Sequence, residues 1–189
     1  MELIADKTFD KNSFTAGSLA KADYELCVFK SCDFSNADLA GIKFVDCKFL
    51  DCDLSLTKLS GTTLRDVQFR NCKMLGLHLF SCNEFGLAVS FDGCNLSHSS
   101  FYQRKIPQTS FQSCQLNEVD FTECNLSSSV FDNCDLTNAK FENTTIEKVD
   151  FRTSFNYSID PNRNRIKKAK FSLSGLPGLL DRYDIDIEL

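Results

Sequence analysis

Large apolar residues recur every five positions along most of this chain, and most of them follow a small residue by two positions. In the stretch FDNCDLTNAKF, Phe131, Leu136 and Phe141 are the large residues, and Cys134 and Ala139 precede the last two. On an α-helix, such positions rotate by about 140° per step and scatter around the cylinder. In a continuous strand, residues five apart point to opposite faces. The pattern therefore predicts strand-like segments of about three residues, each followed by a corner.

The repetition extends over two long runs, in which every central position is large and apolar. The first run contains Phe9, Phe14, Leu19, Tyr24, Phe29, Phe34, Leu39, Phe44, Phe49, Leu54, Leu59, Leu64, Phe69, Met74 and Leu79. The second run contains Phe91, Leu96, Phe101, Ile106, Phe111, Leu116, Phe121, Leu126, Phe131, Leu136, Phe141, Ile146 and Phe151. Such repetition predicts one continuous solenoid whose interior is lined by every fifth side chain.

The ten cysteines share one structural position. Nine lie two residues before a central residue, and Cys82 keeps that phase where the pattern fails. Ala, Thr, Ser and Val fill the same slot in most other pentads, so we interpret the cysteines as small hydrophobes. Cysteines in adjacent coils would lie about 4.8 Å apart, whereas disulfides prefer about 3.8 Å between Cβ atoms. There is no CxxC motif, and His78 and His98 occupy outward phases, so we expect free thiols and no metal site.

Several pentads closely resemble the motif of the pentapeptide-repeat family, a small residue followed by Asp or Asn, Leu or Phe, and two polar residues: CDFSN (32–36), ADLAG (37–41), CNLSS (124–128) and CDLTN (134–138). The resemblance covers about residues 7–153. It implies an all-β fold, a right-handed quadrilateral β-helix with four pentapeptides per coil. The residues themselves support a period of ten, because Phe alternates with Leu or Ile from 91 to 151, and they are compatible with twenty.

The register breaks once within the repeats. Twelve positions instead of ten separate Leu79 from Phe91, so FSCNEFGLAVS (80–90) contains a two-residue insertion, and Glu84 falls on a central position. One interpretation is a tolerated bulge that joins two stacks. The other is a contact loop, since loops on rigid scaffolds often carry binding residues. Glu84 and Phe85 are therefore candidate partner contacts.

A second irregularity is YQRKIPQ (102–108). Arg104 occupies the slot of the small residues, and Pro107 cannot donate to a ladder. We expect Arg104 to swing outward at this point. A local bulge and a recognition surface both explain the irregularity, and the second makes Arg104 and Lys105 candidate partner contacts.

The chain changes character after Phe151, which divides it into a β-helix at 1–153 and a capping and dimerisation segment at 154–189. Apolar residues at helical spacing follow Ser174, a plausible N-cap, and alternation with acids then predicts a strand over residues 185–189. This helix and strand either cap the monomer or join two chains in a two-fold dimer. The candidate dimer interface consists of Leu176, Leu179, Leu180, Tyr183, Ile185 and Ile187.

Charge separates the two runs. The net charge of -5 says little about partners, and acids and bases balance between residues 9 and 79. Between residues 91 and 151, nine acids outnumber the bases. This excess argues against a nucleic-acid binder, which needs a basic stripe. Five of these acids are candidate partner contacts: Glu118, Asp120, Glu123, Asp132 and Asp135.

The sequence contains no motif that indicates catalysis. It has no glycine-rich phosphate loop, no HExxH and no nucleophile with an identifiable base, so we expect a protein that is not an enzyme and needs no cofactor. No run of 18 apolar residues occurs, and the first residues lack the layout of a signal peptide. We therefore expect a cytoplasmic protein that does not bind membranes.

The segments SIDPNRNRI (158–166) and GLLDRYDIDI (178–187) resemble the C-terminal part of topoisomerase-protecting members of the family, namely the microcin immunity protein and, more distantly, the Qnr-type quinolone-resistance proteins. The resemblance implies a dimeric rod whose acidic faces imitate duplex DNA and exclude a poison from DNA gyrase or topoisomerase IV. The long inserted loop of the Qnr pattern is missing, which favours immunity to a peptide toxin or another gyrase poison over quinolone protection. The alternative is a pentapeptide-repeat scaffold that binds some other protein.

Overall fold

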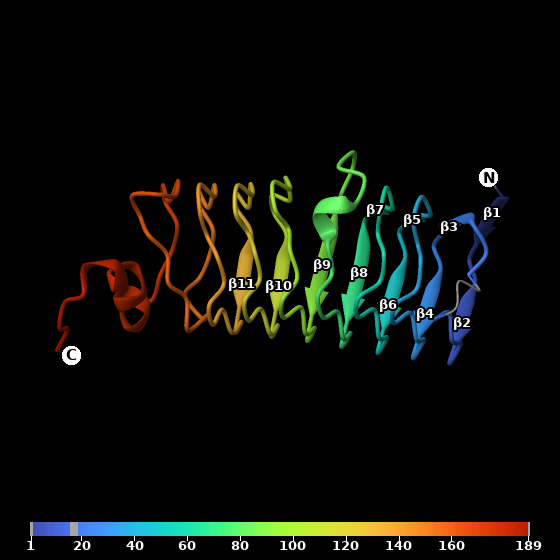
Figure 1. Ribbon diagram of the computed structural model, residues 1–189, viewed down its shortest axis with the longest axis horizontal. Coiled ribbons are helices and arrows are strands. Elements are labelled where there is room, and N and C mark those ends of the chain that lie inside the picture. Colours follow the sequence, from blue (N-terminus) through green and yellow to red (C-terminus); the bar gives the residue numbers. More distant parts are fainter. Residues whose placement is uncertain (1, 16–18, 189) are drawn as a thin grey trace.

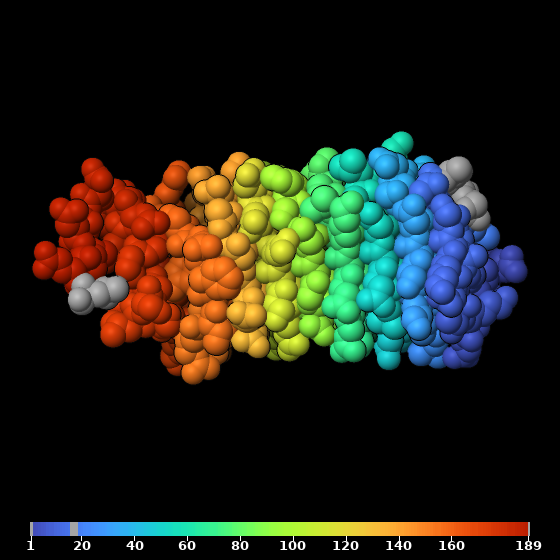
Figure 2. Space-filling model, turned by 90° about the horizontal axis from the view of Figure 1, so that it is seen from below, coloured from blue at the N-terminus to red at the C-terminus, as the bar shows by residue number. Residues whose placement is uncertain are grey.

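The computed structural model describes residues 2–15 and 19–188. The chain winds from one end of an elongated rod to the other, with the two termini at opposite ends (Figure 1). In the space-filling view, the sequence colours follow one another in order along the rod (Figure 2). Each turn of the chain therefore packs mainly on the turns before and after it, as in other solenoids.

Two parallel sheets run along the rod. The first consists of β1 (Glu2–Ala5), β3 (Ala22–Glu25), β5 (Lys43–Val45) and β7 (Thr63–Arg65). The second consists of β2 (Thr8–Asp10), β4 (Val28–Lys30), β6 (Lys48–Leu50), β8 (Val67–Arg70), β9 (Val89–Asp92), β10 (Ser110–Gln112) and β11 (Val130–Asp132). Isolated parallel bridges such as Asp33 with Asp53 and Asp38 with Lys58 connect the coils on the other two sides.

The register between coils is twenty residues. Phe29 of β4 pairs with Phe49 of β6, and Tyr24 of β3 pairs with Phe44 of β5. Four pentads therefore complete one coil, which confirms the quadrilateral β-helix and decides between periods of ten and twenty. We number the four sides by their inward residues: side 1 contains Tyr24, side 2 Phe29, side 3 Phe34 and side 4 Leu39.

Every described central residue of the two runs is buried except Phe9, which is half-buried at the N-terminal end. On side 2, the ring of Phe111 stacks on those of Phe91 and Phe131 with centroid separations of 5.1 and 4.6 Å. Phe121 of side 4 meets Phe111 edge-on at 6.0 Å. Two stacked aromatic columns thus interlock in the favourable edge-to-face geometry, as the alternation of Phe with Leu or Ile predicted.

The small position two residues before each central residue is also a hydrogen-bonding position. All ten cysteines are free and buried, as expected. Many side chains in this slot donate to a backbone carbonyl of the preceding coil. The Cys134 thiol lies 3.4 Å from the Phe111 oxygen, and the Thr57 hydroxyl lies 2.8 Å from the Phe34 oxygen. The slot therefore favours Cys, Thr and Ser for their donors as well as for their size.

The corners depend on left-handed backbone conformations. The second residue after a central residue has φ near +55°, as at Asn36 (57°) and Asn138 (56°). Asparagine tolerates this region better than most residues. On side 3, the Asp33 carboxylate also accepts the backbone N–H of Ser35 at 2.9 Å, which closes the turn. These local bonds explain why Asp and Asn recur next to the central residues.

The coil continues beyond residue 153. Asp150 forms a parallel bridge with Lys170, and Thr145 forms one with Arg165. The Phe171 ring stacks on Phe151 at 5.4 Å, which extends the aromatic column of side 2. Residues 154–171 are thus wound as a further turn of the rod, and the cap starts near residue 172 instead of at the predicted residue 154.

The cap is helical but differs from the expected helix and strand. It contains two 3-10 helices, η2 (Leu173–Leu179) and η3 (Asp181–Tyr183). The N-cap of η2 is Ser172, whose hydroxyl accepts the Gly175 N–H, and not Ser174. The predicted strand is not formed in residues 184–188, and Leu189 lies outside the described residues. Alternation of apolar and acidic residues at the chain end does not produce a ladder within this chain.

Within residues 2–15 and 19–188, no helix is long and apolar enough to span a membrane. The same residues contain no cluster of three or more His, Cys, Asp or Glu side chains that could hold a metal ion.

The stacked core predicts a large cost for removing one ring. Phe111→Ala should lower the free energy of unfolding by about 3–5 kcal/mol, because the cavity lies between two stacked neighbours that cannot close it. Urea titration followed by circular dichroism measures this loss. Gln112→Ala, which removes an exposed side chain from the same strand, is the control and should change the value by about 0.5 kcal/mol or less. Equal losses for the two variants would contradict the predicted packing.

The buried thiols predict a loss of stability at alkaline pH. Burial raises the pKa of Cys82 and Cys124 to about 12 and that of Cys47 to about 11. The pKa of a cysteine thiol in the unfolded chain is about 8.5. Because the folded pKa lies above the unfolded one, the stabilisation is complete below that pH and is lost as the pH rises toward 11–12. Denaturant titrations at pH 8 and 10.5 should show a smaller decline for the triple Cys→Ala variant at these positions than for the native chain, and equal declines would refute the explanation.

Candidate functional site

The two-residue insertion forms a loop on side 1. Val67 of β8 pairs with Val89 of β9, an offset of 22 residues where the other strand pairs have 20. Sheet β1-β3-β5-β7 ends at this point, and the N–H of Ala88 donates to the Leu64 oxygen at 3.0 Å. The chain from Asn83 to Ala88 therefore leaves the side of the rod and returns, as Figure 1 shows between β7 and β9.

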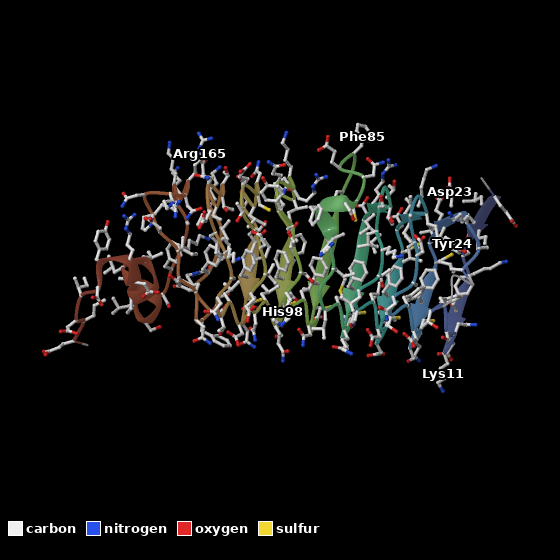
Figure 3. The ribbon with its side chains drawn as sticks, viewed as in Figure 1. Lys11, Asp23, Tyr24, Phe85, His98 and Arg165 are labelled. Carbon is white, nitrogen blue, oxygen red and sulfur yellow. The ribbon has the colours of Figure 1, made fainter. Side chains whose placement is uncertain are left out.

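The loop exposes its tip and anchors its base. Phe85 is 78% exposed, and Figure 3 shows it projecting from the edge of the rod on which Asp23 and Arg165 also lie. At the base, the Asn83 amide donates to the Thr63 hydroxyl at 3.2 Å, and its carbonyl oxygen accepts the Phe85 N–H at 3.0 Å. Leu87 is buried and fills the interior at this level. The Phe85 side chain is therefore exposed to solvent at the tip of a short loop whose base is fixed by hydrogen bonds of Asn83.

Arg104 does not swing outward, contrary to the expectation from the sequence. Its side chain is only 16% exposed and lies beneath the loop. Its Nη1 atom donates to the Cys82 carbonyl at 3.4 Å and lies 3.9 Å from a carboxylate oxygen of Glu84. The reason is that the insertion lifts the loop off the rod and leaves space for the guanidinium. Arg104 is therefore an internal support of the site and not a surface contact.

Side 1 is basic on both flanks of the loop. Arg65 precedes it, with its guanidinium packed close to Gly86 (φ +73°), and Lys105 follows it as an exposed side chain. Further exposed cations continue toward the C-terminal end on this side or at its corner: Lys148, Arg165, Lys167 and Lys168. The acidic excess of the second run is thus not on the side that carries the loop.

The five candidate acids are distributed over three sides. Glu118, Asp120 and Glu123 belong to one coil and lie on side 4 or at its corners, whereas Asp132 lies on side 2 and Asp135 on side 3. The structure therefore brings three of the five together. No run of outward positions on a single side contains all of them, because twenty-residue stacking separates residues whose spacing is not a multiple of twenty.

The acids of side 4 are held by polar side chains of the preceding coil. A carboxylate oxygen of Glu118 lies 3.2 Å from Nδ1 of His98. Glu123 accepts from the Gln103 amide at 2.8 Å, and Asp120 lies 3.5 Å from the hydroxyl of Ser100. These contacts leave the carboxylates on the surface while limiting their rotation. On side 3, burial tends to raise the pKa of Asp135, but hydrogen bonds from Thr137 and Asn156 lower it overall.

The cap attaches to its own chain through Tyr157. A Cβ atom at Gly175 would lie 1.9 Å from the Tyr157 hydroxyl oxygen, so only glycine permits this approach. The Ile159 N–H donates to the Gly178 carbonyl at 2.8 Å, and Arg182 forms an ion pair with Asp160. The segment is therefore a cap of the monomer, whatever further contacts its outer surface makes.

The six candidate dimer residues divide into two groups. Leu179 packs on the core, and Leu180 is half-buried. The exposed group consists of Leu176, Tyr183, Ile185 and Ile187. The Tyr183 hydroxyl accepts from the Asn162 amide at 2.9 Å, which fixes one of these side chains. Four of the six residues thus form an apolar outer surface at the C-terminal end of the rod.

Comparison with known proteins identifies the repeats and the fold. The family described as pentapeptide repeat region matches residues 22–83 and 87–156, with the gap at the inserted loop. Two solved structures of trypsin-treated QnrB1, described as a plasmid-mediated fluoroquinolone resistance protein, are similar to this chain. One has 17% sequence identity and a TM-score of 0.64, covering 99% of this chain and 98% of the other. The second has 16% identity and a TM-score of 0.65, covering 100% and 99%.

At 16–17% sequence identity, the similarity to these structures shows a shared fold and nothing more. No curated protein matches the sequence significantly.

Proposed function

Since this chain belongs to the pentapeptide-repeat family, we propose that it is a binding protein that protects DNA gyrase or topoisomerase IV from a poison. It acts by contact and performs no catalysis. Support comes from the similarity in fold to QnrB1 over nearly the whole of both chains and from the resemblance of residues 158–166 and 178–187 to topoisomerase-protecting members.

The observation that carries the proposal is the combination of a rigid rod, an acidic side and one exposed aromatic anchor. Glu118, Asp120 and Glu123 present carboxylates on side 4 at positions fixed by the coil below. A basic groove that normally holds the phosphates of duplex DNA would attract such a surface. A rod that occupies the groove would displace the DNA or keep the poison out.

The loop would supply specificity to this electrostatic contact. Exposed carboxylates alone steer association but add little affinity, because water and salt screen them. An aromatic side chain that enters a pocket can contribute more than 1 kcal/mol. Phe85, held away from the rod between Arg65 and Lys105, has the exposure and the support that such an anchor needs.

The cap would join two rods end to end. Leu176, Tyr183, Ile185 and Ile187 expose apolar surface at the C-terminal end, and a two-fold axis there would bury both copies. Residues 184–188, which form no strand in the single chain, would be free to pair across that axis. A dimer would double the length of the charged rod.

The second candidate function is a scaffold that binds some other protein. The basic flanks of the loop favour it, because Phe85 between Arg65 and Lys105 also suits an apolar pocket with an acidic rim. A partner engaged through side 1 alone would not need the acids of side 4. The two functions therefore differ in which side of the rod they require.

A gyrase supercoiling assay tests the first proposal. With a fluoroquinolone or a gyrase-directed peptide toxin present, addition of the protein should restore supercoiling. Phe85→Ala should weaken protection by about tenfold through loss of the anchor. Leu26→Ala, which removes another exposed apolar side chain at a distant corner, should not.

A charge variant separates the two functions. Glu118→Gln, Asp120→Asn and Glu123→Gln together should weaken protection, most strongly at low salt. Asp46→Asn, Asp51→Asn and Asp66→Asn remove the same charge from exposed corners of the first run and should have little effect. Failure to rescue supercoiling from either poison, together with no measurable binding to gyrase, would eliminate topoisomerase protection and leave the scaffold.

Light scattering tests the dimer. The native chain should have twice the mass of one chain, and Leu176→Asp with Ile185→Asp should give the monomer without unfolding the rod, because both side chains are exposed. Leu56→Asp, at an exposed position in the middle of the rod, should leave the dimer intact. A native chain of single mass, or a double variant that remains dimeric, would show that this surface only caps the monomer.

A further inference from the structure

Arg104 occupies a position that every regular coil fills with a smaller side chain. On side 1, the other buried residues in this slot are Ala22, Ile42, Thr62, Cys82, Cys124, Thr144 and Asn164. In this column, the hydroxyls of Thr62 and Thr144 each donate to a backbone carbonyl of the preceding coil at 2.8 Å. A guanidinium with a three-carbon stem needs far more space than a hydroxyl or a thiol. A regular coil at this level would be overpacked.

The insertion provides that space. In regular coils, the carbonyl of the slot residue accepts a backbone N–H from the next coil, as the Arg104 oxygen does from Asn125 at 2.9 Å. At the level of the loop, the donor to the Cys82 carbonyl is Nη1 of Arg104, at 3.4 Å. The guanidinium therefore occupies a place in the ladder that opens when residues 83–88 leave the side of the rod.

The arrangement has a cost that a small residue would avoid. The Nε atom of Arg104 is buried and has no hydrogen-bond partner within the described chain. The neighbouring Glu84 carboxylate is 3.9 Å away and 80% exposed, so it compensates the charge only weakly. Arginine in this slot stabilises the coil only if its contacts with the loop outweigh the burial of an unpaired polar atom.

From this balance, we infer that Arg104 and the two-residue insertion form a single unit, in which the guanidinium is a positioning residue that keeps the loop, and Phe85 at its tip, at a fixed height above side 1. The bulge makes room for the arginine, and the arginine prevents the bulge from collapsing onto the rod. Neither irregularity is favourable without the other. The consequence for partner binding rests on the proposed function, whereas the coupling itself rests on geometry alone.

A double-mutant cycle in the full-length protein tests the coupling. Deletion of Phe85 and Gly86 with Glu84→Leu converts residues 82–88 into one regular pentad followed by the existing repeat. We expect this regularised chain to be destabilised while it retains Arg104 and to regain its stability when Arg104→Thr is added. In the native loop, Arg104→Thr should instead destabilise. Urea titration measures the four stabilities, and additive effects with no change of sign would overturn the inference.

The rate at which the loop opens locally tests the positioning role of Arg104 separately from the stability of the whole rod. Arg104→Thr in the native loop should speed hydrogen exchange of the Phe85 and Ala88 amides and chymotrypsin cleavage after Phe85 by about tenfold. Lys105→Thr, which removes the adjacent exposed cation, is the matched control and should leave both rates unchanged. Unchanged rates in Arg104→Thr would overturn the inference.

Gyrase protection by the same variants separates this inference from the proposed function. Faster loop opening with about tenfold weaker protection supports both. Faster opening in a protein whose native form never protects gyrase supports the coupling and refutes topoisomerase protection. Unchanged opening with weaker protection refutes the positioning role of Arg104 and leaves the proposed function in place.

Discussion

The structure depends on one constraint: each coil must place its inward side chains directly on those of the coil before it, twenty residues earlier. Backbone ladders impose this register, since Phe29 pairs with Phe49 and Phe111 with Phe131. The same register stacks like rings on like rings and sets the small slot within reach of a carbonyl in the preceding coil. Hydrophobic burial, aromatic stacking and hydrogen bonding are therefore satisfied by a single translation along the axis. A side chain that suits one coil suits its neighbours, which is why so few residue types occur inside.

The outward positions are free from this constraint, and the chemistry of each side is set by residues that only stacking brings together. Side 1 collects cations around the loop, whereas side 4 collects Glu118, Asp120 and Glu123. Polar partners from the preceding coil hold these carboxylates without burying them. A rod of this kind presents differently charged surfaces along the same axis, and a partner selects one by its own charge.

The inserted loop and the C-terminal end require special residues, because there the regular repeat cannot supply the backbone hydrogen bonds or cover the apolar interior. At residues 83–88, the ladder of side 1 is broken, and Arg104 supplies a donor from an unusual position. At the C-terminal end, Gly175 and Gly178 let η2 approach Tyr157 closely enough to cover the last coil. Both solutions place a residue type where the regular coils do not use it: an arginine in the small slot, and glycines against a tyrosine ring. The places where the sequence departs from its own period are thus the inserted loop and the end of the rod.

The period of five alone indicated which residues are inside, that short strand-like segments alternate with corners, and that the cysteines occupy one repeated inward position. The all-β quadrilateral coil was implied by the resemblance of the pentads to the pentapeptide-repeat family. The period of five also located the insertion and Phe85. Only the tertiary structure decided which outward residues share a side, because that requires the circumference of the coil and the register across the insertion; it separated Asp132 and Asp135 from the acids of side 4. The inward orientation of Arg104 likewise depends on contacts with a loop 16–21 residues away in sequence, and residues 184–188 form no strand ladder with the rest of the described chain. The local sequence pattern specifies whether each side chain points inward or outward. Which outward side chains lie next to one another is decided only when the coils stack.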